Sequence, residues 1–365
     1  YYTQVIVVDK SNQRSEPSPE ISAVAGDAQR SSTLVVAASD ASPASRAGAD
    51  FVCTGTGDQT VIMDAIAALP ENGGVIVLSE GTFIVNDNIN VKSNITIRGN
   101  NSVIKAELIS SLSQGWGIIN YNKAYVTGNP PIENFTLSNI KIDCQYSKQH
   151  IRDDAINIVG AANLILENVT VTDGYFGVNI DDCSDVLIYN CNIGANFLTA
   201  LYLVSGQRCT IGPNNILHDS DDGIFAYILR NSSIKGNKIY QNRGHGMQLS
   251  AAYIVDAGNY GTPSESVEIC ENYVYSNSQE GNDRYSNIRL TTNCDNISVR
   301  NNIVRAGDLT NKPKYGISVD GAYNLITNND CHESGVTAGI YNAGTNTNFG
   351  AGNRNNNGNW STTPN

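Results

Sequence analysis

Apolar and polar residues alternate along this chain in short runs that recur with a period too long for a single helix or strand. The first inward apolar residues of these runs are separated mostly by 22 or 23 positions, and they are Ile156, Val178, Leu201, Ile224, Met247, Ile288, Ile317 and Ile340. A second series of runs, such as "LILENVTV" and "SSIKGNKI", falls between them on the same period. Each repeat therefore supplies at least two short strands and an Asn- or Gly-rich corner.

Strands this short cannot bury an apolar face alone, so the repeats must stack on one another. The pattern predicts an all-β protein, a parallel β-solenoid of about ten coils. A leucine-rich repeat has a similar period, but this chain lacks its L-x-x-L-x-L frame. A β-sandwich would show turn signals more often and would lack this self-similarity.

The segment before the repeats has a different pattern. "GDQTVIMDAIAALPENGG" spaces its apolar residues as a helix does, which predicts a short helix near residues 58–69 that covers the first edge of the solenoid. Residues 1–20 resemble the last strand of a fibronectin type III module. We interpret residues 21–50 as a linker or edge segment and residues 51–365 as the solenoid domain, with neighbouring domains in a larger secreted chain.

The helix followed by "GGVIVLSEGTF", together with the repeats, resembles the right-handed parallel β-helix proteins that act on polysaccharides. These include pectin- and disaggregatase-type polysaccharide lyases, mannuronan C5-epimerase modules and phage tailspikes. The resemblance implies a right-handed parallel β-helix with an N-terminal capping α-helix. It also implies an extracellular or cell-surface location and a groove on one face for an acidic or amino-sugar-containing polysaccharide.

Stacked coils place equivalent positions about 4.8 Å apart, so the repeats can be read as columns. Asp222 and His245 are one period apart, and Arg289 projects from the next coil beside Gln248. We expect the Asp222 carboxylate to bond to the His245 imidazole, to raise its pKa and to fix its tautomer. The candidate catalytic residues are Asp222, His245, Arg289, Tyr227 and Asp221.

The step from Met247 to Ile288 is longer than the others, which inserts a loop beside the His245 coil. Long loops on a rigid scaffold often form binding walls, and this one is rich in tyrosine. The candidate substrate-binding residues are Asp181, Tyr202, Phe225, Gln248, Tyr253, Arg284 and Tyr315.

Removal of a proton beside a uronate carboxylate needs a cation to neutralise the carboxylate and a base within hydrogen-bond reach. Arg289 or Arg284 could neutralise the carboxylate, and His245 or Tyr227 could take the proton. The reaction predicted is β-elimination by a polysaccharide lyase. "HDSDDGIF" and "RGHGMQ" are similar to two coils of mannuronan epimerases, but their Asp-Pro-His-Glu motif is absent and "NIDDC" stands nearest to it.

Two alternatives stay open. Polygalacturonase-type glycoside hydrolases also carry a paired-Asp coil followed by "GHG", although their Asn-x-Asp is missing here; Asp181, two coils from Asp222, is the conceivable second carboxylate of an inverting pair. The other alternative is a non-catalytic, tailspike-like carbohydrate-binding surface protein.

The composition disfavours two classes of binding partner. A net charge of −12 and a pI near 4.7 disfavour nucleic acid, and no apolar run is long enough to span a membrane. The 8 cysteines lack zinc-site spacing, which favours buried free thiols, with one or two disulfides as the alternative. No cofactor is required by the sequence, and Asp181 and Asp221 are the candidate ligands if Ca²⁺ binds.

Overall fold

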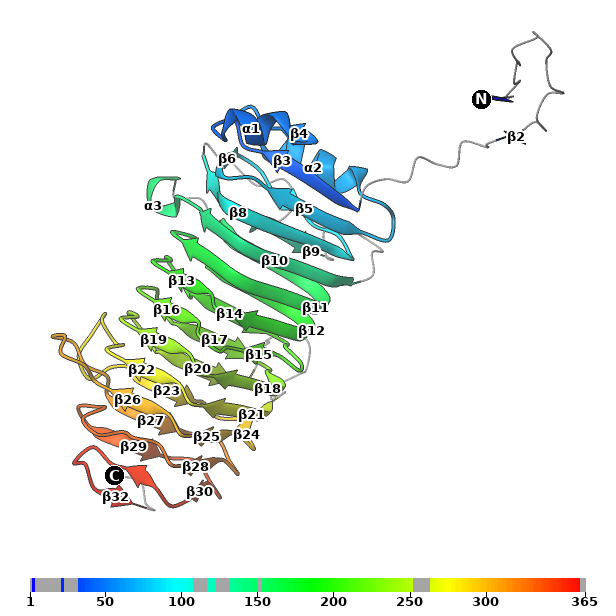
Figure 1. The fold of residues 1–365 in the computed structure, drawn as a ribbon. Coiled ribbons are helices and arrows are strands. Elements are labelled where there is room, and N and C mark those ends of the chain that lie inside the picture. Colours follow the sequence, from blue (N-terminus) through cyan, green and yellow to red (C-terminus); the bar gives the residue numbers. More distant parts are fainter. Residues whose placement is uncertain are drawn as a thin grey trace, which may run out of the picture.

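The computed structural model describes residues 2–3, 21–22, 32–107, 117–122, 131–149, 153–251 and 263–361. The described chain winds into a parallel β-helix, in which each strand pairs in parallel with strands of the neighbouring coils (Figure 1). The predicted all-β solenoid is therefore confirmed. Two short strands, β1 (Tyr2–Thr3) and β2 (Ile21–Ser22), pair antiparallel, and most of the segment assigned to a preceding domain lies outside the described residues.

The strands fall into three stacks. A complete coil therefore contains three strands, one more than the minimum that the sequence predicts. The first stack carries the predicted core column, and it contains β7 (Ile89–Asn90), β9 (Gly117–Asn122), β11 (Asp154–Thr172), β12 (Val178–Tyr189), β14 (Leu201–Val204), β17 (Ile224–Tyr227), β20 (Met247–Ser250), β23 (Ser286–Leu290), β27 (Tyr315–Val319) and β29 (Ala338–Asn342).

The second and third stacks complete each coil. The second stack shares β11 and β12 and adds β3 (Thr33–Ala37), β5 (Gly74–Leu78), β8 (Ile95–Ala106), β10 (Ile132–Asp143), β15 (Thr210–Ile211), β18 (Arg230–Lys235), β21 (Ser264–Cys270), β25 (Ser298–Arg300), β28 (Leu325–Thr327) and β30 (Asn348–Phe349). The third shares β8, β10 and β11 and adds β6 (Gly81–Val85), β13 (Asn192–Gly194), β16 (Ile216–His218), β19 (Lys238–Tyr240), β22 (Tyr273–Tyr275) and β26 (Ile303–Arg305).

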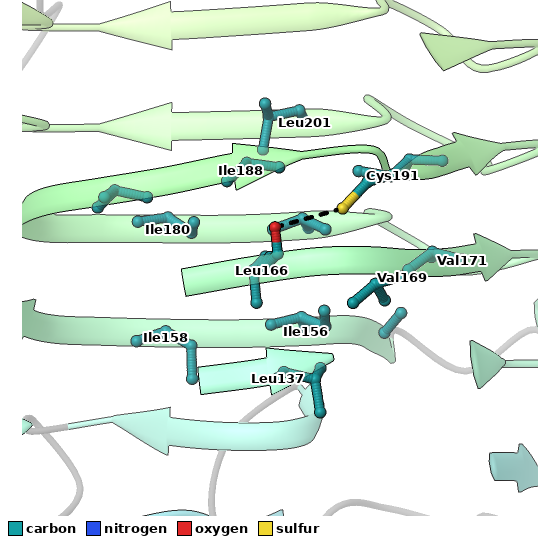
Figure 2. Close-up of a cluster of buried hydrophobic side chains, with 14 of the residues drawn as sticks. Leu137, Ile156, Ile158, Leu166, Val169, Val171, Ile180, Ile188, Cys191 and Leu201 are labelled. Atoms are coloured by element: carbon teal, nitrogen blue, oxygen red, sulfur yellow. Dashed lines mark hydrogen bonds between the residues drawn. The ribbon is translucent and has the colours of Figure 1, made fainter. Parts of the chain in front are cut away.

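The core is a column of aliphatic side chains inside the coils. Figure 2 shows Ile156, Ile180 and Leu201, from successive strands of the first stack, among the buried side chains that fill it. The sequence-derived core column is confirmed in register, because Ile156 pairs with Val178 and each later member pairs with the next. Burial of these apolar side chains is the main source of the stability of such a solenoid.

Buried asparagines satisfy the backbone at one corner of the coils. The N–H of Asn237 donates to Oδ1 of Asn272 at 3.0 Å, and Nδ2 of Asn272 donates to the carbonyl of Ile234 at 2.9 Å. The N–H to Oδ1 bond repeats in a ladder along Asn237, Asn272, Asn302, Asn329 and Asn353, and Asn215 on the coil before donates its side-chain amide to Ile188 in the same way. The ladder explains why this chain is rich in asparagine, since a buried turn must find hydrogen-bond partners.

The N-terminal end of the solenoid is covered as predicted. Helix α2 (Gln59–Ala68) buries Ile62, Ala65 and Ile66 against the core. Ahead of it, strand β3 pairs with β4 (Phe51–Val52) and β5, and the short helix α1 (Pro43–Ala47) follows β3, so part of the segment at 21–50 forms an edge of the sheet. The division of the chain into domains stays a prediction.

The remaining elements lie at corners and at the C-terminal end. They are α3 (Tyr146–Gln149), β24 (Cys294–Asp295), β31 (Asn353–Arg354) and β32 (Trp360–Ser361). All cysteines are buried free thiols, which confirms the favoured interpretation, and the disulfide alternative is wrong. Some of the thiols bond backbone carbonyls, as Sγ of Cys191 does to Leu166 at 3.6 Å (Figure 2).

Candidate active site

The outer surface of the first stack carries the predicted cluster. The carbonyl oxygen of Asp222 accepts the N–H of Ala200, and that of His245 accepts the N–H of Gly223. Asp222 and His245 therefore occupy equivalent positions in successive coils. Gln248 pairs with Phe225 on one side and with Arg289 on the other. The period of the sequence therefore brings Asp222, His245 and Arg289 onto three neighbouring coils of one face.

Asp222 contacts His245 through the backbone and not through the ring. Its Oδ1 accepts the main-chain N–H of His245 at 2.5 Å, which corrects the expectation of a carboxylate–imidazole bond. The side chain is buried, and desolvation raises the pKa of Asp222 to about 7, against a smaller lowering by that hydrogen bond. This carboxyl group therefore keeps its proton to a much higher pH than an exposed aspartate does.

His245 is neutral at physiological pH. Burial and the nearby charge of Arg289 lower its pKa to about 3, so the expectation that Asp222 raises this pKa is wrong. Nη1 of Arg289 lies 3.3 Å from Nε2, while Nδ1 lies 3.0 Å from the nitrogen and 3.2 Å from the oxygen of Ser286. The Ser286 N–H donates to Nδ1 and the Arg289 guanidinium faces Nε2, so both ring nitrogens face a donor. In the tautomer with its proton on Nδ1, this proton faces the Ser286 carbonyl and Nε2 has the lone pair.

Tyr285, one of the tyrosines of the predicted loop wall, lies beside His245 together with Glu280, which the sequence analysis did not assign. The Tyr285 ring meets the imidazole edge to face at 5.1 Å, and its hydroxyl donates to Glu280 at 2.5 Å, which raises the pKa of Tyr285 to about 12. Arg284, a predicted substrate contact, pairs with Glu280 at 3.3 Å and lies over the Tyr285 ring at 4.9 Å. Arg284 therefore belongs to the wall, whereas Arg289 is the cation at the imidazole.

Asp221 faces a different partner from Asp222. It lies 3.9 Å from Nε of Arg243, and burial raises its pKa. Within the described residues, no group of three or more His, Cys, Asp or Glu side chains is arranged to hold a metal ion. Asp181 and Asp221, the candidate calcium ligands, come from different coils, since Asp181 lies on β12 and Asp221 precedes β17.

An aromatic column adjoins the cluster on its N-terminal side. The rings of Phe176 and Tyr202 stack at 4.8 Å, and those of Tyr202 and Phe225 at 6.0 Å. Tyr227 packs against Phe225 at 4.7 Å, and burial and Asp222 raise its pKa. Exposed faces of such rings are the surfaces on which sugars stack.

The other predicted contacts are distributed around this column. Asp181 shares a column with Val204 and Tyr227, two coils before Asp222 in the stack. Tyr315 pairs in register with Ser286, on the coil after it, and stacks on Tyr341 at 4.5 Å. Nε2 of Gln248 donates to Ser250.

Tyr253, the remaining predicted contact, lies outside the described residues. Ser286 was not predicted, although it contacts the imidazole nitrogen. The signal that could have found it is its place in the column of Asp222 and His245.

Comparison with known proteins identifies the family. The family model described as "Right handed beta helix region" matches residues 71–256, 154–306 and 199–357. The chain therefore belongs to the right-handed β-helix family, which gives the solenoid its handedness. No curated protein matches the chain, and no helix in the described part of it is long and apolar enough to cross a bilayer.

Several solved structures are similar to this fold. The A-module of a mannuronan C-5 epimerase from Azotobacter vinelandii has a TM-score of 0.65 at 16% identity, with 79% of each chain covered. The Dettilon tailspike protein has a TM-score of 0.60 at 16% identity, covering 80% of this chain and 62% of its own. DFA-IIIase from Arthrobacter chlorophenolicus has a TM-score of 0.54 at 12% identity, with 80% and 86% covered. At these identities the likeness concerns the fold.

Proposed function

We propose that this protein is an extracellular polysaccharide lyase that cleaves a uronate-containing polysaccharide by β-elimination on the face of the first stack. The observation that carries the proposal is the contact of 3.3 Å between Nε2 of His245 and the guanidinium of Arg289. A neutral base beside a fixed cation is what removal of a proton next to a carboxylate requires. Asp222, with a pKa of about 7, adds a carboxyl group that can donate a proton near neutral pH.

In the first part of the reaction Arg289 binds the substrate carboxylate, which makes the neighbouring carbon more acidic. Nε2 of His245 takes the proton from this α-carbon. The charge of Arg289 contributes to the low pKa of His245, so a bound carboxylate offsets that charge and makes the imidazole more basic. Substrate binding thus activates the base.

In the second part the electron pair of the broken α C–H bond forms the double bond between the α- and β-carbons. The bond from the β-carbon to the glycosidic oxygen breaks, and this oxygen takes a proton from Asp222. Since Oδ1 of Asp222 accepts the N–H of His245, the proton resides on Oδ2. Exchange with water returns His245 to its neutral form and Asp222 to its protonated form.

The aromatic column supports a carbohydrate substrate, because Phe176, Tyr202 and Phe225 lie along the solenoid axis beside the cluster. A structural neighbour named for an enzyme that acts on mannuronan is compatible with a uronate, although this likeness carries the fold alone. A hydrolase is less well supported. Asp181 is two coils from Asp222 and also in a different column, since it aligns with Tyr227, five residues after Asp222. At about 3.3 Å per residue this lateral offset alone is about 16 Å, whereas inverting carboxylates stand about 6.5 to 9.5 Å apart.

The test is ultraviolet absorbance during incubation with polygalacturonate, alginate and glucuronate-containing polymers, because only elimination creates an unsaturated uronate. We expect absorbance to rise with at least one polymer and to be lost in Arg289→Gln. Arg300→Gln is a matched control, because Arg300 pairs with Glu268 on β21, in the second stack. New reducing ends without absorbance would establish hydrolysis, and binding without any product would establish a non-catalytic protein; either result would overturn the proposal.

A further inference from the structure

A second row of aromatic rings lies on the third stack, away from the candidate active site. His218, Tyr240 and Tyr275 pair in register on β16, β19 and β22. The His218 and Tyr240 rings stack at 5.3 Å with 9° between their planes, and the Tyr240 and Tyr275 rings at 5.1 Å with 13°. At the N-terminal end of this row, the ring of His218 packs over Gly194, and a Cβ at Gly194 would lie 2.5 Å from the ring.

Tyr273 extends this row sideways and is open to solvent. It lies two residues before Tyr275 on the same strand, so both side chains point outward, and their rings stack at 4.5 Å. Tyr273 is 41% exposed, and the residue that pairs with it on the next coil, Ile303, is 47% exposed. The apolar surface left open here is thus an aromatic ring with an aliphatic side chain beside it.

Tyr273 also lines two hollows in the surface. One, of about 620 Å³, is bordered by Arg305, Lys312, Asp308 and Asn356 as well. The other, of about 400 Å³, contains Lys238, Glu271 and Asn237. Both hollows therefore combine one exposed ring with carboxylate, amide and ammonium groups, which are the partners that sugar hydroxyls use.

Lys238 holds the row in place. Its Nζ lies 4.9 Å from the centre of the Tyr240 ring and 5.7 Å from that of Tyr275, so the cation faces both rings. Arg305 forms an ion pair with Asp330 at 2.6 Å. The charges around Tyr273 are of both signs, and this mixture fits a hydroxyl-rich ligand better than a strongly charged protein surface.

We propose that Tyr273 and the two hollows beside it form a second carbohydrate-binding site, which holds a further stretch of polysaccharide by stacking a sugar ring on Tyr273. The site is built on β19, β22 and β26, whereas the candidate active site is built on β17, β20 and β23. It tethers the polymer and takes no part in bond cleavage. The proposal does not depend on the lyase reaction, since a protein without catalysis would use the same surface.

The test is retardation of the full chain in gels that contain polygalacturonate, alginate or a neutral β-glucan. The background is His245→Gln, which prevents cleavage during the run. We expect Tyr273→Ala to weaken binding about tenfold, the scale of one stacking contact on a ring, and Tyr273→Phe to retain it. Tyr323→Ala is the control, because Tyr323 is 62% exposed and lines neither hollow.

Equal retardation of Tyr273→Ala and its parent, or retardation by none of the three polymers, would overturn the second site. Thermal unfolding of each variant checks that the fold is retained. Cleavage of short uronate oligosaccharides by the chain with His245 intact is measured separately with Tyr273→Ala, and we expect no change. Loss of retardation with unchanged cleavage therefore supports the second site, and loss of both overturns it in favour of a role in the active site.

Discussion

Oδ1 of Asp222 accepts the main-chain N–H of His245 at 2.5 Å, so the two residues are joined through the backbone. The same relationship occurs earlier in the column, where Oδ1 of Asp154 accepts the N–H of Phe176 at 3.2 Å. A carboxylate at this position therefore has a structural role in the stack. At Asp222 it also lies beside an imidazole and a guanidinium, and this second setting is the basis for its proposed chemistry.

Comparison of Asp222 with Asp154 allows the structural role of the carboxylate to be separated from its proposed catalytic role. Asp222→Asn keeps an oxygen for the N–H of His245 but removes the acid, so we expect elimination to slow about a hundredfold or more. Asp154→Asn removes the equivalent carboxylate three coils away and should leave the rate of elimination unchanged. Equal losses of activity in both variants would assign Asp222 a structural role only. The measurement is kcat/KM on the most reactive polyuronate, with thermal unfolding to compare stability.

Activity should fall as pH rises above neutrality. The proposed acid, Asp222, must be protonated and has a pKa of about 7, whereas the proposed base, His245, must be unprotonated and has a pKa of about 3. The free enzyme therefore has both groups in the required form between these values, and the profile of kcat/KM should decline above about 7. A profile that rises from pH 6 to pH 9 would contradict this assignment of acid and base.

Removal of Arg289 should make His245 easier to protonate. The guanidinium is the second cause of the low pKa after burial, so Arg289→Gln should raise the pKa of His245 while burial still holds it below its usual value. The measurement is an NMR titration of the histidine rings, of which the chain has 4. The ring signals of His218, which bonds Asp219 in the third stack, provide the internal control and should be the same in both proteins. An unchanged titration of His245 would show that Arg289 does not face this ring in solution.

A buried carboxylate outside the active site should make stability depend on pH. Neither oxygen of Asp153 has a hydrogen-bond partner among the other described residues, and desolvation raises the pKa of this group to about 7 against a smaller lowering by its own backbone N–H. Because the folded state holds this proton more tightly, its contribution is fully present below about pH 4 and is lost as pH rises through 7. Between pH 5 and pH 8 the wild type should lose about 2 to 3 kcal/mol relative to Asp153→Asn.

Denaturant unfolding of the two proteins at both pH values gives this difference directly. The comparison cancels the contribution of other groups, including His245, whose lowered pKa acts in the opposite direction. A difference that is constant with pH would mean that Asp153 is not held in an apolar environment.

The sequence predicted the solenoid and its core because a coil needs one inward aliphatic residue at a fixed period. The pairings from Ile156 to Met247 follow from that period alone, whereas those of Ile288 with Met247 and Ile317 span longer steps. The same logic placed Asp222, His245 and Arg289 on neighbouring coils. It could not show whether the Asp222 carboxylate meets the main-chain N–H or the imidazole of His245, since both groups belong to the same residue.

Other features depend on geometry that periodicity does not contain. The column places Ser286 beside His245, but spacing does not show that its main-chain N–H and carbonyl are the groups that meet the imidazole. The low pKa of His245 follows from burial, which a surface position in a column did not suggest. The hollows beside Tyr273 likewise bring together side chains from several coils, and spacing does not show their directions.

The most direct test of the proposed active site is a crystal structure of His245→Gln with a bound uronate oligosaccharide. We predict that a uronate carboxylate lies against the guanidinium of Arg289, with its α-hydrogen directed toward residue 245 and the glycosidic oxygen near Asp222. A uronate bound with its carboxylate away from Arg289, or a chain that avoids the face of the first stack altogether, would contradict the account.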